Sequence, residues 1–355
     1  MGFFESLQDG DLVLDSLPDD VAATIEVRNK FMTNLSMGGH VGAEFVLSDL
    51  QRWLPGQTVR VAFLDGNKDL HGDIEAATKQ ITDACNLTLD FGKDAQGDYR
   101  RWTEADPQHV AEIRVSFDKQ GYFSLVGIDS INRNVGAPTE RVGGRANQAS
   151  LNLGGFVLQK PSTWRGTVRH EFLHALGFHH SHQNMRGPCE ASFRWDDDQG
   201  YEPTQDARGA FIEDHNGRRP GIYTYLAGFP NFWRRDKVDH NLKTEEDPSL
   251  VVGPFDRKSV MLYRFPELFY KTANSPCAPD GDGQSLSDID KRGLQLLYPG
   301  TAAEMNPIVD SQRTLQNELE KLETRREVGA ESARGVGGTA LLSAALEALR
   351  NRQAP

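Results

Sequence analysis

The residues with the clearest chemistry lie in the segment RGTVRHEFLHALGFHHSHQ, near the middle of the chain. Within it, His170, Glu171, His174, Gly177 and His180 have the spacing H-E-x-x-H-x-x-G-x-x-H. On a helix, His170 and His174 lie one turn apart, so both imidazoles project from one face and can bind a single zinc ion. We expect Gly177 to adopt a positive φ and to turn the chain back, which brings His180 to the same ion.

The residue after the first histidine is suited to a different role. Glu171 is rotated away from the histidine pair, too far to be a natural third ligand but within reach of a water on the metal. Three histidines leave the fourth position of a tetrahedral zinc ion to water, which is typical of a catalytic site. Zinc would lower the pKa of this water towards about 7, and Glu171 would accept its proton and return it to a departing amine.

Simpler explanations exist for each part of this motif. Single histidines on helices are usually packed or solvated, and a bare H-E-x-x-H also occurs by accident. The longer motif fixes five positions, so we estimate its chance occurrence in such a chain at below about one in ten thousand. His179 and His182 flank the third ligand position without occupying it. We interpret them as exposed or supporting residues, and a substrate or metal role for one of them stays open.

Composition limits the possible partners. The 355 residues suffice for one sizeable catalytic domain with appendages or for two modest domains. Acidic residues outnumber basic ones by 51 to 39, and a field of this sign repels nucleic acid and anionic lipid. No apolar run approaches the roughly 20 residues of a membrane-spanning helix, and no secretory signal is recognisable. We expect no nucleic-acid partner, no membrane span, and a protein that is cytoplasmic or secreted without a recognisable leader.

A sheet backed by one helix is predicted before the metal motif. The segment TVRVAFL has the composition and length of a strand. Residues 72–85 place Ile74, Ala77, Ile81 and Ala84 at helical spacing, so one helix face should pack on the sheet. Further strand candidates are NLTLDF, AEIRVSF, GYFSLVG and QASLNLGG.

The second half of the chain is less regular. From about residue 183 to 255, the many Gly, Pro and Asp residues predict mostly loop with short elements. A helix follows in SLSDIDKRGLQLLYPG, with Ser287 as N-cap and Asp290 as its capping partner. The catalytic domain should end near residue 300, after this helix.

The chain therefore divides into three parts. Residues 1–50 show no clear period and are interpreted as a leader or docking segment, residues 51–300 as the catalytic domain, and residues 301–355 as a helical tail. In the tail, an amphipathic helix after Pro307 is followed by a joint at Gly335–Gly338 and a second helix. Residues 308–350 could bind a partner or pack on the domain, and packing is favoured because an exposed apolar face is unfavourable.

The motif is that of the metzincins, and residues 51–300 resemble astacin-type zinc metallopeptidases. DRKSVMLYRF resembles the Met-turn of astacins, which makes Met261 the Met-turn residue. Tyr263 matches the tyrosine that ligates zinc or stabilises the oxyanion in astacins, although without the zinc motif both would be interpreted as core residues. The resemblance implies an α+β fold of two subdomains, with a mixed twisted sheet, a backing helix, an active-site helix and an irregular lower subdomain. It also implies a zinc-dependent endopeptidase.

The sequence departs from astacins in two places. Ser181 follows the third histidine where astacins carry Glu, so the resemblance does not extend to their activation by a buried new N-terminus. Three cysteines cannot form the paired disulfides of astacins. Cys85 is interpreted as a core residue on a helix, and Cys189 and Cys277 lie in loops where they could form a disulfide or remain two unpaired thiols.

Two questions stay open after the motif is assigned. The clusters Asp196–Asp198 and Asp280–Asp282 could bind calcium, but neither has the full ligand spacing of a calcium loop, so loop carboxylates without a metal are the favoured interpretation. The function could also be that of a catalytically inactive zinc-containing binding protein or a zinc hydrolase of a non-peptide amide. An intact Glu171 with Tyr263 favours catalysis, and an edge strand at GYFSLVG, along which a substrate could lie extended, favours peptides.

Overall fold

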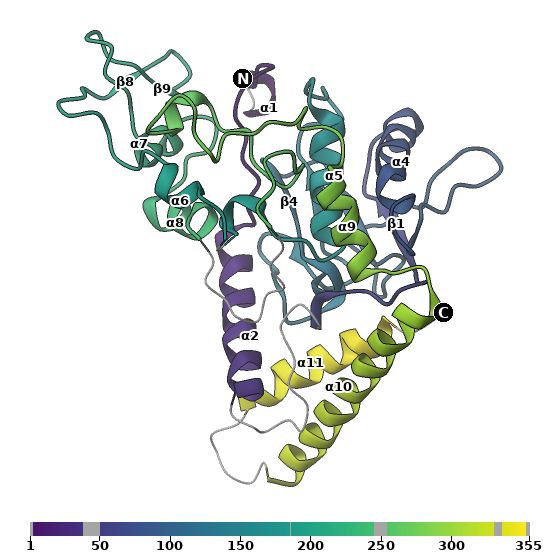
Figure 1. Ribbon diagram of the computed structural model, residues 1–355. Helices are drawn as coiled ribbons and strands as arrows, with labels where there is room; N and C mark the ends of the chain where they lie inside the picture. Colours follow the sequence, from purple (N-terminus) through teal and green to yellow (C-terminus); the bar gives the residue numbers. More distant parts are fainter. Residues whose placement is uncertain (1–2, 38–49, 185, 245–253, 330–335, 353–355) are drawn as a thin grey trace.

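Figure 1 shows the computed structural model of the chain. It describes residues 3–37, 50–184, 186–244, 254–329 and 336–352. A sheet with its helices lies on one side of the molecule, and a lobe of short elements lies on the other (Figure 1). We call the latter the loop-rich lobe, residues 186–244 and 254–280. The α+β class predicted from the sequence is confirmed.

Among the described residues the sheet has five strands, and four of them are parallel. In spatial order they are β2 (Thr88–Asp90), β1 (Thr58–Phe63), β3 (Ile113–Ser116), β7 (Leu151–Leu153) and β4 (Tyr122–Ser124). The last strand runs antiparallel to β7, with Tyr122 opposite Leu153, and forms one edge of the sheet. The sheet is therefore mixed, as expected, and all five strands fall within the segments predicted for them.

The predicted strand GYFSLVG is shorter in the structure than expected, because β4 ends at Ser124. Leu125 donates one further backbone hydrogen bond to Ser150 before the chain enters the 3₁₀ helix η1 (Gly127–Ile131). Gly127 has a φ of 52°, and a Cβ at this position would lie 1.7 Å from the carbonyl oxygen of Gln51. At this glycine, three residues after the end of β4, the chain turns away from the sheet.

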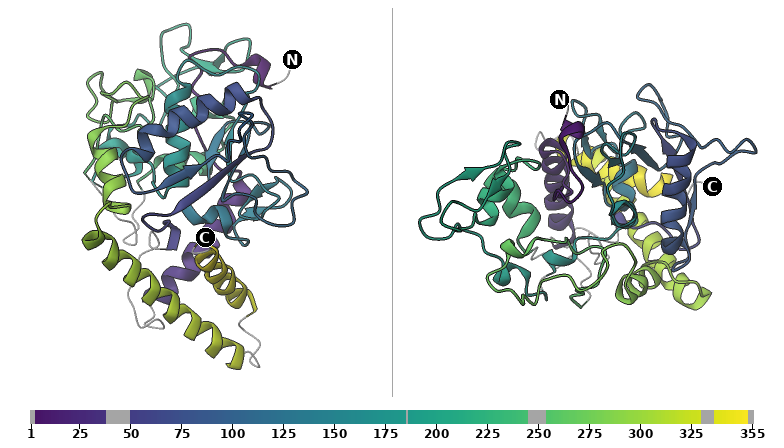
Figure 2. Two further views of the ribbon diagram at one scale, coloured as in Figure 1. Left: turned by 90° about the vertical axis from the view of Figure 1, so that its right-hand side faces the viewer. Right: turned by 90° about the horizontal axis from the view of Figure 1, so that it is seen from above.

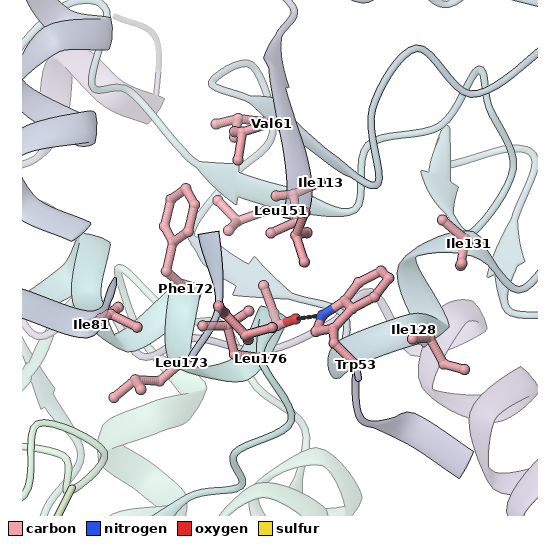
Figure 3. Close-up of a cluster of buried hydrophobic side chains, with 14 of the residues drawn as sticks. Trp53, Val61, Ile81, Ile113, Ile128, Ile131, Leu151, Phe172, Leu173 and Leu176 are labelled. Atoms are coloured by element: carbon pink, nitrogen blue, oxygen red, sulfur yellow. Dashed lines mark hydrogen bonds between the residues drawn. The ribbon is translucent and has the colours of Figure 1, made fainter. Parts of the chain in front are cut away.

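Two helices pack side by side against the sheet. Helix α4 (Lys68–Thr82) begins four residues before the predicted start, because the Asn67 side chain caps it by accepting a hydrogen bond from the backbone of Leu70. Helix α5 (Trp164–Ala175) contacts α4, β7 and β4. Figure 3 shows the core between these elements, where the indole Nε1 of fully buried Trp53 donates to the carbonyl of Ala175, 2.9 Å away.

The N-terminal part contains a long helix that the sequence pattern did not indicate. After α1 (Phe3–Ser6) and an extended stretch, α2 (Asp19–Met37) packs against β5 (Gly136–Ala137) and α11. Its inward face includes Arg28, whose Nη2 donates to the Asp129 carboxylate over 2.6 Å, with both side chains buried. Because a charged residue interrupts the apolar face, periodicity alone gives no helix signal here.

The loop-rich lobe has its own apolar core and short elements, as predicted for this region. A disulfide joins Cys189 to Cys277 in that core, which decides a pairing that the sequence left open. The remaining short elements of the chain are β6 (Val142–Gly143), η2 (Ser181–Gln183), α6 (Cys189–Ser192), β8 (Thr204–Gln205), β9 (Phe211–Ile212), α7 (Ile222–Ala227), α8 (Arg235–Leu242) and η3 (Glu267–Phe269).

Three helices complete the chain. Helix α9 (Asp288–Leu297) has the predicted capping box of Ser287 and Asp290. Helices α10 (Ala302–Gly329) and α11 (Val336–Asn351) pack against each other, and their leucines join the main core. The structure thus shows packing and gives no support for the partner alternative. The predicted joint is wrong at its C-terminal end, because Val336 and the two glycines after it belong to α11, while residue 335 lies outside the described residues. Within the described ranges, none of the helices is long and apolar enough to cross a membrane.

The three cysteines allow a simple chemical check. Burial raises the pKa of the half-buried Cys85 thiol to about 11, so little of it is the reactive thiolate near neutral pH. We expect slow alkylation of the native protein, one alkylated cysteine after unfolding without reductant, and three after reduction. Mass spectrometry of the alkylated chain measures this, and two or three modified cysteines in the unreduced chain would contradict the disulfide.

Candidate metal centre

The metal motif lies at the C-terminal end of α5, where His170, Glu171 and His174 are all buried. The helix ends at Ala175 with Leu176 as its C-cap, and Gly177 has a φ of 97°, which is the positive value expected for a sharp turn. The chain then doubles back, and the ring of His180 comes to lie 4.5 Å from that of His174, centroid to centroid. The three histidines of the motif therefore meet at one point.

Contacts of the Nδ1 atoms fix the orientation of the three imidazole rings. Nδ1 of His170 lies 2.8 Å from the carbonyl oxygen of Val260, and Nδ1 of His174 lies 2.7 Å from that of Phe178. Nδ1 of His180 lies 3.2 Å from Oε1 of Gln183. Nδ1 must donate its proton in these contacts, so in the neutral form of each ring the lone pair is on Nε2. The Nε2 atom of His174 lies 3.1 Å from both other Nε2 atoms. Three lone pairs thus face one small space.

This donor set fits a zinc ion. Nitrogen ligands at about 2.0 to 2.1 Å from a tetrahedral ion are separated by about 3.4 Å, close to the spacing seen. Burial lowers the pKa of His174 to about 3, with a contribution from the neighbouring His180, so its ring is in the neutral form that binds metals. Converging lone pairs repel one another, and a bound cation removes that repulsion.

Glu171 lies beside the histidines without joining them. Its side chain is buried, and among the described residues no group hydrogen-bonds its Oε2 atom. Burial, together with the nearby Asp15 carboxylate, raises the pKa of Glu171 well above its usual range. A buried carboxylate oxygen without a partner is costly for stability, so it points to a use in binding or chemistry.

A fourth side chain joins the histidines, and it comes from the N-terminal segment. The carboxylate of Asp15 lies 3.0 Å from Nε2 of His180 and 3.5 Å from Nε2 of both His170 and His174. These four residues are the group of the described chain whose atoms could hold a metal ion. Although burial opposes it, the pKa of Asp15 is lowered well below its usual range by His180 and His170. Asp15 is therefore a carboxylate and a potential fourth ligand.

The N-terminal segment, residues 7–18, lies between the sheet and the loop-rich lobe (Figures 1 and 2). On the sheet side, the backbone N–H of Ser16 donates to the carbonyl of Tyr122 in the edge strand, 3.1 Å away. On the lobe side, Asp11 pairs with Arg208 at 2.8 Å. A cavity of about 420 Å³ is lined by this segment together with His170 and Glu171. The segment covers the metal group.

The segment predicted as the Met-turn adjoins the histidines. Met261 is buried, and its carbonyl accepts a hydrogen bond from the backbone of Ser181, 3.0 Å away. The ring of Tyr263 lies 4.6 Å from that of His180, and its hydroxyl donates to the backbone carbonyl of Asp15 over 2.9 Å. The match to the Met-turn therefore places Met261 and Tyr263 beside the metal group.

The turn is itself held by α9. The Asp290 carboxylate accepts hydrogen bonds from Ser259 Oγ at 2.6 Å and from the backbone N–H of Val260 at 3.1 Å. The carbonyl of Val260 in turn accepts from His170. A helix cap predicted only for its local role thus also positions a metal-facing histidine.

Comparisons with known proteins give matches among solved structures. No protein-family model and no curated protein matches the sequence. One structure of myroilysin is 23% identical with a TM-score of 0.49, and the match covers 71% of this chain and 97% of that one. A second myroilysin structure is 22% identical with a TM-score of 0.41, covering 70% and 86%. High choriolytic enzyme 1 of Oryzias latipes, a hatching enzyme and zinc-protease, is 14% identical with a TM-score of 0.38, covering 69% and 90%.

The chain is similar to these proteins. At this level of similarity, the activity has to be argued from the site itself. Two features of that site were not predicted from the sequence. One is Asp15, and the other is the role of Asp290 in holding the turn at Ser259 and Val260. Asp15 lies 155 positions before His170, so no spacing links it to the histidines. The short apolar clusters and acidic residues around it were the sequence features of this segment, and they do not indicate a metal ligand.

The remaining candidates lie outside this group. His179 does not belong to the metal group, and the side chain of His182 is outside the described residues. Asp197 accepts hydrogen bonds from the backbone of Gly221, and Asp198 pairs with Arg194 at 3.0 Å. The Asp282 carboxylate accepts from two backbone N–H groups and one hydroxyl. These carboxylates stabilise loops, which is the alternative to calcium binding that the sequence favoured.

Proposed function

We propose that the chain is a zinc-dependent endopeptidase whose metal is bound by His170, His174 and His180. The observation that carries this proposal is the convergence of three Nε2 atoms beside buried Glu171, whose Oε2 atom has no hydrogen-bond partner among the described residues. When bound at such a site, zinc acidifies a water ligand to a pKa of about 7 and polarises a carbonyl. The residues around it then determine which bond is broken.

Glu171 and Tyr263 have separate roles in the proposed reaction. Glu171 accepts a proton from the attacking water as the new C–O bond forms, and it passes this proton to the amine nitrogen as the C–N bond breaks. The Tyr263 hydroxyl already donates to a carbonyl oxygen, that of Asp15, next to the histidines. Once Asp15 has left, the same hydroxyl can donate to the oxyanion that develops on the substrate.

The path of the N-terminal segment supports an endopeptidase. Residues 7–18 continue on both sides of Asp15, the residue at the metal group, and line the cavity beside it, which supports a site that accepts a chain with residues on both sides of the reacting bond. Part of its binding is to the edge strand, through the carbonyl of Tyr122. Hydrogen bonds of this kind suit a peptide better than a small non-peptide amide.

We propose that the enzyme is inactive while Asp15 and the rest of residues 7–18 lie over the metal group. If His170, His174, His180 and Asp15 all held a zinc ion, it would have four protein ligands and no position left for water, as in sites of the closed type. The segment also fills the space that a substrate would need. Activity therefore requires that residues 7–18 leave the cleft.

The convergence of four potential ligands also supports a second candidate function, that of a zinc-containing protein whose metal site stays closed and catalyses no reaction. Removal of Asp15 separates the two. If the site is catalytic, the Asp15→Ala variant binds zinc and cleaves an unfolded protein, whereas a closed structural site yields zinc binding without cleavage.

The test of the metal assignment uses the ligand histidines. We expect about one zinc ion per chain in the wild type and in Asp15→Ala, and loss of most zinc from His174→Ala. Cleavage of a reduced and alkylated protein by Asp15→Ala should stop with a chelator and return with added zinc. Metal content is measured by atomic emission and cleavage by electrophoresis. Full zinc content in His174→Ala, or cleavage that persists with the chelator, would refute the proposal.

A further inference from the structure

The loop between α7 and α8 contacts the main chain of the segment in the cleft. Oδ1 of Asn231 accepts a hydrogen bond from the backbone N–H of Leu14 at 3.0 Å, and its Nδ2 donates to the carbonyl of Leu12 at 2.8 Å. We propose that, in the peptidase inferred above and resting on that function, Asn231 binds the main chain of substrates in the same way and recognises an extended backbone irrespective of side chains.

The geometry explains why this contact is independent of sequence. In an extended chain, the C=O of one residue and the N–H of the residue two positions later point to the same side. A side-chain amide has one acceptor and one donor group, so Asn231 takes the place of a peptide group in a neighbouring strand. The two hydrogen bonds involve only backbone atoms of Leu12 and Leu14. Any residue can supply the carbonyl, and any residue except proline can supply the N–H.

The loop that carries Asn231 is held by hydrogen bonds within the loop-rich lobe, which do not involve residues 7–18. On one side of Asn231, the backbone of Phe229 donates to Gly209, and on the other side Trp233 donates to Leu226 over 2.7 Å. Trp233 is buried in the core of the loop-rich lobe. Because the loop is already ordered, little conformational entropy is lost when a peptide binds to it.

The position of Asn231 relative to the metal group determines which part of a substrate it would contact. The two contacted residues lie one and three positions before Asp15, whose carboxylate is at the histidines. On the opposite side of the segment, Ser16 is bonded to the edge strand. A substrate would thus be held between Asn231 and the sheet, with the contacted N–H a few residues from the bond that is cleaved.

The test replaces backbone N–H groups of the substrate with ester oxygens. A peptide cleaved by the full-length Asp15→Ala protein is synthesised with one ester at each position, in turn, on both sides of the scissile bond. Each ester peptide is compared with its all-amide parent in the Asp15→Ala protein and in the same protein carrying Asn231→Ala. Only the ratio of the two kcat/KM values within one protein is used, because any change in how firmly residues 7–18 occupy the cleft affects both peptides equally.

We expect one position at which the ester lowers kcat/KM by about 10-fold or more with Asn231 present, since the ester oxygen faces Oδ1 and cannot donate. The ratio should approach 1 with Asn231→Ala. Asn231→Asp keeps the acceptor and should remain sensitive to the ester at that position. Asn216→Ala removes an exposed amide from the same lobe and should behave like the parent. Thermal unfolding and zinc content of each variant establish that it is folded.

Two results would overturn the inference, and they differ from each other. If the effect of every ester is the same with and without Asn231, the main-chain contact does not occur with substrates, although the peptidase function stands. If the Asp15→Ala protein cleaves no peptide at all, the proposed function fails and the inference fails with it.

Discussion

Replacement of Glu171 by Gln is expected to lower kcat about 100-fold or more while the zinc content stays near one ion per chain. The amide has the shape of the carboxylate but cannot accept the proton of the attacking water, and general acid–base catalysis typically contributes a factor of about 10² to 10⁴. Glu171 is not among the four residues that converge on the metal position. The loss should therefore appear in the rate and not in metal binding.

The measurement compares kcat and zinc content of Asp15→Ala with those of Asp15→Ala/Glu171→Gln, so that the cleft is open in both. Glu267→Gln is a matched control, because it makes the same chemical change at an exposed carboxylate of the loop-rich lobe. Unchanged cleavage after Glu171→Gln would mean that another group accepts the proton. Loss of zinc together with activity would mean that Glu171 supports the metal site instead.

Replacement of Asp15 by Ala is expected to raise the activity of the full-length chain by about 10- to 100-fold. The carboxylate lies 3.0 to 3.5 Å from three imidazole nitrogens in a buried site, and hydrogen bonds to charged groups contribute about 1.5 to 3 kcal/mol. The other contacts of the segment, at Asp11 and at the Asn231 amide, remain in the variant. For that reason we expect a large gain but not complete release of the segment.

Initial rates on a reduced and alkylated protein measure this gain. Asp15→Asn, which keeps the shape and removes the charge, should lie between the wild type and Asp15→Ala. Asp20→Ala removes an exposed carboxylate from the first turn of α2 and should leave the rate unchanged. An Asp15→Ala protein no more active than the wild type, with zinc bound in both, would show that Asp15 does not restrain activity.

The sequence by itself determined the features that depend on neighbouring residues. The one-turn spacing of His170 and His174, the turn at Gly177 and the capping box of α9 are all formed within a few residues, and all are present in the structure. The strands and α4 were also found, because alternating or helical apolar spacing is a local property of the chain. Their ends were less well predicted, since they depend on particular contacts such as the cap at Asn67.

The tertiary structure alone decided which distant residues meet. Asp15 contacts His180, which lies 165 positions later in the sequence. Arg28 interrupts the apolar face of α2, so the helix has no clear apolar period, and the distant Asp129 carboxylate offsets the charge of Arg28. The pairing of Cys189 with Cys277 was likewise open in the sequence. The physical reason is the same in each case. Such contacts form only when a long stretch of chain is closed by packing elsewhere, and local spacing contains no information about that closure.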